Sequence, residues 1–247
     1  MIPTHRRDLL KTLGAIAPLC AAAPAFAQSA PCPVESPEAA RAHTDFAWLA
    51  RYDEDNRRLL ADGTPTRLVF IGDSITQGWR DKNPEFFSEG RVNRGIGGQT
   101  TPQMLLRMMQ DVIALSQRAV HIMAGTNDIA GNTGPMTAEM THNNISAMAT
   151  LAKAHHIRVL IASIPPAANF PWRPGLDTRT PIAAHNLWLR DYAAAKGHVW
   201  VDYHPALATP DGGMRDGLAV DGVHPTLAGY AAMNAVLLPI LTRLHLA

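Results

Sequence analysis

The sequence predicts an α/β protein in which a parallel sheet of about five strands is covered by helices on both faces. Short apolar runs alternate along the chain with longer segments of helical character, the order expected of strands joined by crossover helices. Most of these runs contain few polar residues, which is typical of strands buried on both faces. The chain has 247 residues, of which 47% are hydrophobic and 17% charged, so it is long enough for one substantial core.

The first 27 residues are expected to be an export signal. Arg6 and Arg7 precede an apolar segment over 13–23, and residues 25–27 form a small-x-small cleavage site. The apolar segment is too short to anchor the chain in a bilayer. The basic stretch around Arg6 and Arg7 resembles a twin-arginine signal, and the general secretory pathway is the alternative. We therefore expect a periplasmic or secreted protein without a membrane anchor.

Composition argues against several classes of partner and cofactor. The formal net charge is +1, and it becomes −1 without residues 1–27, because three basic residues and one acidic residue leave with them. No run of like charge is present, so nothing indicates a nucleic acid or an anionic membrane surface as partner. Cys32 is the one cysteine outside the signal, which excludes an intramolecular disulfide. No Cys/His spacing indicates zinc, and we expect neither a metal nor a cofactor.

Residues 28–38 contain three prolines and are predicted to be a mobile leader to a single domain over 39–247. The domain is predicted to begin with a helix over 39–60, which Asp62 and Gly63 end. The apolar side chains of this helix are expected to cover the sheet: Phe46, Leu49, Leu59 and Leu60.

Five strands and the helices between them are predicted from the apolar runs and their boundaries. Thr100 is a suitable N-cap, and Pro102 is a suitable early residue, for a helix over 103–115. His121 is expected to be a buried strand histidine and not a catalytic one. Strands are predicted over 67–71, 91–94, 119–124, 157–162 and 198–202. Further helices are predicted near Gln77 and over 137–155, 182–195 and 226–244.

The first strand leads directly into Gly72, Asp73 and Ser74. Ser74 is therefore expected just past the carboxyl end of a buried strand, at the edge of an open α/β sheet where ligands bind. A helix that starts behind it would turn backbone N–H groups toward negative charge on a reacting group. Ser74 is thus a candidate nucleophile, and an ordinary turn is the alternative when these three residues are taken alone.

Three more blocks follow in order: Asn-Arg-Gly-Ile-Gly-Gly at 93–98, Gly-Thr-Asn-Asp at 125–128 and Asp-Gly-Val-His at 221–224. Together with 72–74 they resemble the SGNH hydrolase family, also called GDSL esterases and lipases. The resemblance covers nearly all of the chain after the signal. It implies a flavodoxin-like three-layer αβα sandwich and a serine hydrolase that acts on carboxylic esters through an acyl-enzyme.

A serine hydroxyl is a weak nucleophile until a base takes its proton, and histidine suits this task near neutral pH. His224 follows Asp221 by three residues, and a turn at Gly222 would place both side chains on the same side. Asp221 can then fix the imidazole tautomer and leave the other ring nitrogen for Ser74. The order Ser, Asp, His matches the family's triad. A local Asp–His contact is the alternative, and no third residue nearby favours a metal site.

The resemblance further implies an oxyanion hole made by the N–H groups of Ser74 and Gly98 and by the side-chain amide of Asn127. Glycine allows close backbone approach, and an amide donates without adding charge, so both residue types suit the task. Asp73 and Asp128 are expected to orient neighbours or stabilise turns. Asp73 is also a candidate for contact with substrate, and a glycosidase built on the two carboxylates is an alternative.

A long proline-rich loop is predicted over 165–181, at the ligand-binding edge of the sheet. Trp172 and Arg173 at its middle are candidates for substrate binding, with simple packing as the alternative for Trp172 and Phe170. A stiff loop would restrict the acyl pocket, and 95–101 resembles the branch of platelet-activating-factor acetylhydrolases and bacterial acetyl esterases. We therefore expect an esterase for acetyl and other short acyl groups on a small-molecule or carbohydrate substrate. Alternatives are an acyltransferase to a sugar hydroxyl, a lysophospholipase or lipase for longer chains, and a non-catalytic carbohydrate-binding protein.

Overall fold

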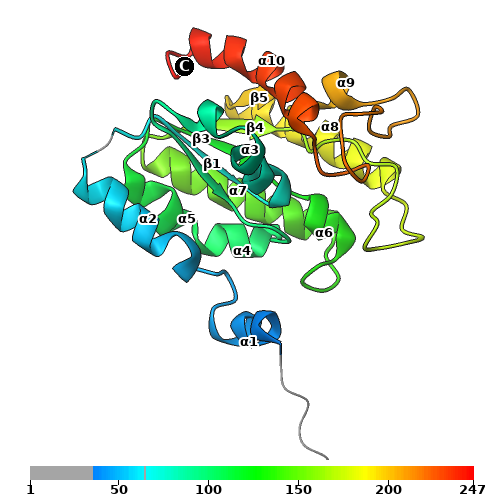
Figure 1. The fold of residues 1–247 in the computed structure, drawn as a ribbon, viewed down its shortest axis with the longest axis horizontal. Helices are drawn as coiled ribbons and strands as arrows, with labels where there is room; N and C mark the ends of the chain where they lie inside the picture. The colour runs from blue at the N-terminus through cyan, green and yellow to red at the C-terminus, as the bar shows by residue number, and fades with distance from the viewer. Residues whose placement is uncertain (1–35, 64) are drawn as a thin grey trace, which may run out of the picture. The chain divides into compact units, whose positions relative to one another are not determined.

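A five-stranded parallel sheet forms the centre of the fold, as the sequence predicts (Figure 1). The strand order is β2-β1-β3-β4-β5. In the register of the sheet, Gly72 of β1 pairs with Gly95 of β2 and with Met123 of β3, so the carboxyl ends of these three strands lie level. The strands are β1 (Leu68–Gly72), β2 (Arg91–Gly95), β3 (Ala119–Met123), β4 (Arg158–Ala162) and β5 (Val199–Val201).

The computed structural model describes residues 36–63 and 65–247. Within it, Pro37–Ala247 form one compact unit. The expected export signal and residues 28–35 of the expected leader lie outside the described residues. No helix of the described part is long and apolar enough to cross a membrane.

Side chains of successive β1 residues alternate between two cores. Leu68 and Phe70 pack against one set of helices, and Val69 and Ile71 pack against another, and all four side chains are fully buried. This two-sided burial explains why β1 is a continuous apolar run. The first core is covered by α3 (Ser74–Lys82), α9 (His204–Leu207) and α10 (Leu227–Arg243). The second is covered by α4 (Thr101–Leu106), α5 (Met108–Asp111), α7 (Ala138–Ala154) and α8 (Arg179–Lys196).

The strand order places a topological switch point between β1 and β3. From β1 the chain first crosses to β2 on one side, and it later returns to β3 on the other side. The connections after β1 and β3 therefore diverge, and open α/β sheets bind ligands beyond the carboxyl ends of strands at such a point. Ser74 follows β1 and Asn127 follows β3, so both candidate residues lie at this edge of the sheet.

The predicted helix over 39–60 is wrong in extent and in the face it buries. Two helices, α1 (Pro37–Thr44) and α2 (Ala50–Ala61), replace it, and α1 begins inside the predicted leader. Between them the carboxylate of Asp45 accepts hydrogen bonds from the N–H groups of Leu49 and Ala50, at 2.7 and 3.0 Å, and so satisfies two backbone donors at the start of α2.

Polar contacts hold α2 against the domain, whereas three of the four apolar side chains predicted to cover the sheet are exposed: Phe46, Leu49 and Leu60. Leu49 and Leu60 are 38% and 52% exposed. The buried residues of α2 are Tyr52 and Asn56. The Tyr52 hydroxyl donates to the carbonyl of Gly95, and the Asn56 amide donates to the Asp111 carboxylate at 2.8 Å. A search for apolar periodicity does not detect such an attachment.

The predicted helix over 103–115 is divided into α4, α5 and a 3₁₀ turn, η2 (Ile113–Leu115). Its start is as predicted, because Thr100 and Gln103 form a capping box. The division falls at Arg107, whose fully buried guanidinium donates to the carbonyl of Gly72 and to Asp111, both at 3.1 Å. Arg107 therefore stabilises the carboxyl end of β1.

Other boundaries agree with the predicted ones to within a few residues. Three short elements were not predicted, η1 (Pro84–Phe87), α6 (Thr126–Ala130) and α9. Helix α8 begins at Arg179, so Pro181 belongs to that helix and the loop after β4 ends at Thr178.

Candidate active site

The chain turns sharply between β1 and α3, and Ser74 is the first residue of α3. Only glycine fits at position 72, because a Cβ there would lie 2.1 Å from the Thr76 hydroxyl and 2.8 Å from the carbonyl of Met123. Asp73 caps α3, since its carboxylate accepts a hydrogen bond from the N–H of Ile75 at 2.9 Å. The turn thereby presents the half-buried Ser74 side chain at the carboxyl edge of the sheet.

Ser74, His224 and Asp221 form a continuous hydrogen-bonded chain. The Ser74 Oγ lies 2.9 Å from Nε2 of His224, and Nδ1 of His224 lies 2.7 Å from Oδ2 of Asp221. The other carboxylate oxygen of Asp221 accepts from the backbone N–H of His224 at 2.8 Å. A turn at Gly222, with φ of +82°, closes this loop. With Nδ1 donating to Asp221, Nε2 is the acceptor for the Ser74 hydroxyl.

Burial and hydrogen bonding act in opposite directions on the two carboxylates near His224. Burial alone raises the pKa of Asp221, but hydrogen bonds from the backbone and ring of His224 outweigh it and hold that pKa below the ordinary value. Asp73 is buried completely, and burial raises its pKa to about 6 against the opposing effects of the Ile75 N–H and of His224. Because Asp73 lies under the turn, its place fits turn stabilisation better than contact with substrate.

Three groups are the candidate donors to an oxyanion on a Ser74 adduct: the N–H groups of Ser74 and Gly98 and the side-chain amide of Asn127. In the described part of the chain, neither the Ser74 N–H nor the Gly98 N–H donates to a protein acceptor. The Gly97 N–H, by contrast, donates to the Gln77 side chain at 2.8 Å. Gly98 has φ of +76°, a conformation suited to glycine. These contacts favour Gly98 over Gly97 as a donor.

A second asparagine fixes the orientation of the Asn127 amide. Nδ2 of Asn127 donates to the carbonyl of Gln99 at 3.0 Å, which leaves one N–H of that group for another acceptor. Oδ1 of Asn127 accepts from Nδ2 of Asn132 at 2.8 Å. The carboxamide therefore cannot turn its oxygen toward Ser74 without losing this bond. Asn132 is not among the site residues predicted from sequence, and its place directly after the α6 C-cap Gly131 is the one signal that could have indicated it.

Buried polar groups set the position of α6, which carries Asn127. Gly125 has φ of +130°, and a Cβ there would lie 2.4 Å from Nε2 of His185, so glycine is required. Burial lowers the pKa of His185 to about 4, and the neutral ring lies 3.0 Å from the carbonyl of Ala124. Asp128 accepts from the N–H of Thr101 at 3.0 Å and from the Thr141 hydroxyl at 3.2 Å.

The same contacts argue against the glycosidase alternative. Burial raises the pKa of Asp128 even though Thr101 and Thr141 donate to it. Its carboxylate is thus engaged by these groups, and that of Asp73 is engaged by Ile75. A glycosidase needs two carboxylates that flank an open substrate site. Asp73 and Asp128 are instead buried, where Asp73 stabilises the turn before α3 and Asp128 holds α6 in position.

His121 is buried in β3, as the sequence analysis expects. Its Nε2 lies 2.9 Å from the Tyr203 hydroxyl, and burial lowers its pKa to about 3. The contact with Tyr203 and the complete burial assign His121 to the core.

Trp172 lies beside His224, at the rim of the candidate site. Its ring stacks on Phe170, with centroids 5.0 Å apart, and lies 5.8 Å from the His224 ring. Nε1 of Trp172 also donates to Oδ1 of Asn132 at 3.2 Å. Phe170 is fully buried, whereas Trp172 is 37% exposed, so Phe170 packs the loop onto the core and Trp172 faces outward. Arg173 is exposed and lies against Gly131, at the end of α6.

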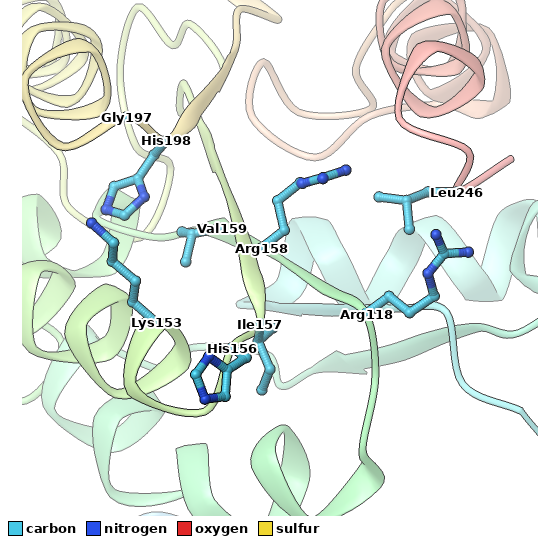
Figure 2. A pocket seen from close by; sticks show the side chains of 9 residues that line it. All are labelled: Arg118, Lys153, His156, Ile157, Arg158, Val159, Gly197, His198 and Leu246. Atoms are coloured by element: carbon cyan, nitrogen blue, oxygen red, sulfur yellow. The ribbon is translucent and has the colours of Figure 1, made fainter.

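A separate cavity of about 450 Å³ opens at the opposite edge of the sheet, where β3, β4 and β5 begin. Figure 2 shows Lys153 beside His198 on one side of it and Arg118 near Leu246 on the other. Arg118 also donates to the carbonyl of His245 at 3.2 Å, which ties down the C-terminal turn. No serine, cysteine or carboxylate is among the described residues that line this cavity. It therefore lacks the groups for acyl transfer.

The chain is similar to one known protein family and to several solved structures. The GDSL-like lipase/acylhydrolase family model matches residues 70–232. A candidate acylhydrolase (BF3764) from Bacteroides fragilis is 40% identical, with a TM-score of 0.78 over 82% of this chain and 99% of that one. A GDSL-like lipase (BT0569) from Bacteroides thetaiotaomicron is also 40% identical, with a TM-score of 0.76 over 81% and 99% of the two chains.

One more distant solved structure shares the fold alone. Axe2, an acetylxylan esterase from Geobacillus stearothermophilus, is 20% identical, with a TM-score of 0.55 over 70% of this chain and 93% of that one. The comparison with curated proteins found no match.

Proposed function

The chain belongs to the GDSL-like lipase/acylhydrolase family, and from that premise we propose that it is a serine esterase for acetyl and other short-chain esters. Ser74 is the nucleophile, His224 the general base and acid, and Asp221 the group that orients His224. The observation that carries the proposal is the chain of two short contacts, 2.9 Å from Ser74 to His224 and 2.7 Å from His224 to Asp221.

In the first half of the reaction, the Ser74 Oγ attacks the ester carbonyl carbon while its proton passes to Nε2 of His224. The carbonyl oxygen gains the negative charge and accepts hydrogen bonds from the N–H groups of Ser74 and Gly98 and from the Asn127 amide. Collapse of this intermediate breaks the bond to the alcohol oxygen, which leaves with the proton from His224. The acyl group remains as an ester on Ser74.

In the second half, water attacks the acyl carbon and gives one proton to His224. The carboxylic acid leaves, and the Ser74 oxygen recovers the proton. In both halves His224 is transiently an imidazolium, and the Asp221 carboxylate, whose pKa lies below its ordinary value, stabilises that charge.

The preference for short acyl groups is supported by the loop after β4. Pro165, Pro166 and Phe170 of this loop are buried, which fixes it to the core. Trp172 stacks on Phe170 and is hydrogen-bonded to Asn132, so its ring is held on two sides next to His224. A fixed indole there limits the room for a long chain.

The alcohol part of the substrate is proposed to be a carbohydrate or another small molecule. The export signal expected over 1–27 agrees with a substrate in the periplasm or outside the cell. We therefore propose that the protein is periplasmic or secreted.

Labelling with a fluorophosphonate probe and turnover of 4-nitrophenyl acetate test the proposal. Ser74→Ala is expected to lose labelling and to lower kcat by about 10⁴-fold or more, whereas Ser88→Ala, at an exposed serine, keeps both. His224→Ala is expected to cost about as much as Ser74→Ala, because members of a triad act as a unit. His155→Ala, at an exposed histidine, is its control. Near-normal turnover by Ser74→Ala would refute the mechanism.

A further inference from the structure

The segment that connects α1 and α2, residues 45–49, is tied to the domain by three glutamine side chains. The amide of Gln103 donates to the carbonyl of Phe46, and that of Gln99 donates to the carbonyl of Ala47, each at 2.7 Å. The amide of Gln110 donates to the carbonyl of Leu49 at 2.6 Å. Since all three acceptors are backbone groups, these bonds fix the path of the 45–49 segment without using the side chains of Phe46 and Trp48.

Trp48 has an unusual backbone conformation in this segment. Its φ is +52°, in the left-handed region that a bulky side chain rarely adopts. The guanidinium of Arg41 lies 4.2 Å from the centroid of the Trp48 ring, and that of Arg51 lies 5.6 Å from it. A conformation that is disfavoured locally and held by its surroundings is often found at a functional site.

The 45–49 segment forms one wall of a cavity of about 500 Å³. Phe46, which is 39% exposed, and Trp48 line this wall. Gly98 lines the cavity from the side of the oxyanion donors, and Asn132 and Thr133 line it from the loop after α6. The cavity therefore shares Gly98 with the candidate oxyanion hole and shares Asn132 with the contact that orients the amide there.

We propose that Phe46 and Trp48 form a subsite that binds a sugar ring in the alcohol part of the ester. A sugar has apolar C–H faces, which suit the two aromatic side chains, and hydroxyl groups at its rim, which suit the exposed Asn132 and Thr133. An alkyl chain in the same place would cover these exposed polar side chains without offering them a hydrogen bond. The inference rests on the proposed function, because a short acyl group leaves only the alcohol part to reach this cavity.

The test compares kcat/KM for acetylated xylobiose with kcat/KM for 4-nitrophenyl acetate. Trp48→Gly removes the ring and relieves the backbone strain, and its matched control is Glu89→Gly, at an exposed residue with φ of +54°. Phe46→Ala is the second variant, with Leu49→Ala in the same segment as its control. The ratio of the two kcat/KM values is expected to fall about tenfold in both cavity variants, mainly through KM for the sugar ester, and to stay constant in the controls.

Three results would overturn the inference. The first is a ratio that does not change in Trp48→Gly and Phe46→Ala. The second is a selective loss on 4-nitrophenyl octanoate, which would assign the cavity to the acyl chain. The third is a wild-type protein that hydrolyses 4-nitrophenyl acetate but not acetylated xylobiose. The first and third leave the proposed function in place, and the second leaves the role of Ser74 in place but contradicts the preference for short acyl groups. A Ser74 that takes no fluorophosphonate label, together with no ester turnover, would refute the proposed function itself.

Discussion

The substitution Asp73→Asn is expected to make the protein relatively more stable as the pH rises. Asp73 is completely buried, and burial raises its pKa from 3.8 to about 6. An asparagine oxygen at the same place can still accept the hydrogen bond from Ile75, so the cap of α3 is retained. The variant therefore removes the titration of this side chain and keeps its structural contact.

The sign and size of the effect follow from the two pKa values. Below pH 3.8 the carboxyl group is protonated in both states, and its contribution to stability is fully present. Between pH 3.8 and about 6 the unfolded chain releases the proton while the folded protein keeps it, so the free energy of unfolding of the wild type falls. The full gap corresponds to about 3 kcal/mol, of which about 2 kcal/mol falls between pH 4.5 and 7.5.

Urea denaturation at several pH values measures this difference. The free energy of unfolding of Asp73→Asn, minus that of the wild type, is expected to rise by about 2 kcal/mol from pH 4.5 to 7.5. Any constant cost of the new amide cancels in this comparison. Asp216→Asn, at an exposed carboxylate, is the control and keeps a constant difference. Profiles that stay parallel to within about 0.5 kcal/mol would refute the reasoning.

Three further predictions concern the site and the signal. Asn132→Ala should lower kcat by about 10-fold or more and should change KM little. In an Asn127→Ala background the same substitution should have almost no further effect, whereas additive losses would show that Asn132 does not act through Asn127. Trp172→Ala should raise the relative kcat/KM on butyryl and hexanoyl 4-nitrophenyl esters, and an unchanged profile would remove Trp172 from the acyl pocket. Arg6→Lys combined with Arg7→Lys should leave the precursor uncleaved in the producing cell, whereas unchanged secretion would indicate the general pathway.

The parts of the fold that sequence could predict are those that apolar pattern or local chemistry determines. The parallel sheet follows from short apolar runs such as Leu68–Ile71, which is buried on both faces. The family resemblance, carried by four polar blocks, is confirmed by the family comparison. Each of these blocks lies where the chain leaves the sheet or turns back toward it, so a candidate nucleophile and base could be chosen before any distance was known.

The parts that could not be predicted depend on side chains that bind distant backbone groups. The 45–49 segment was expected to be helical, but its path is set by Gln99, Gln103 and Gln110, which donate to its carbonyl groups. A carbonyl group is the same at every residue, so no sequence pattern marks it as an acceptor. The division of the helix at Arg107 has the same origin, because its guanidinium binds the carbonyl of Gly72.

The ionisable side chain of Asp73 has a cost in stability that its structural role does not explain. Capping of α3 does not require it, since asparagine caps as well as aspartate, and burial makes the ionised form unfavourable at neutral pH. The charge does, however, interact with His224. In the proposed mechanism His224 carries a positive charge in both halves of the reaction, and an ionised Asp73 beneath Ser74 stabilises that state along with Asp221. The stability that the wild type loses between pH 3.8 and about 6 is not regained at higher pH. In the proposed mechanism this cost accompanies an ionised carboxylate that stabilises the imidazolium of His224.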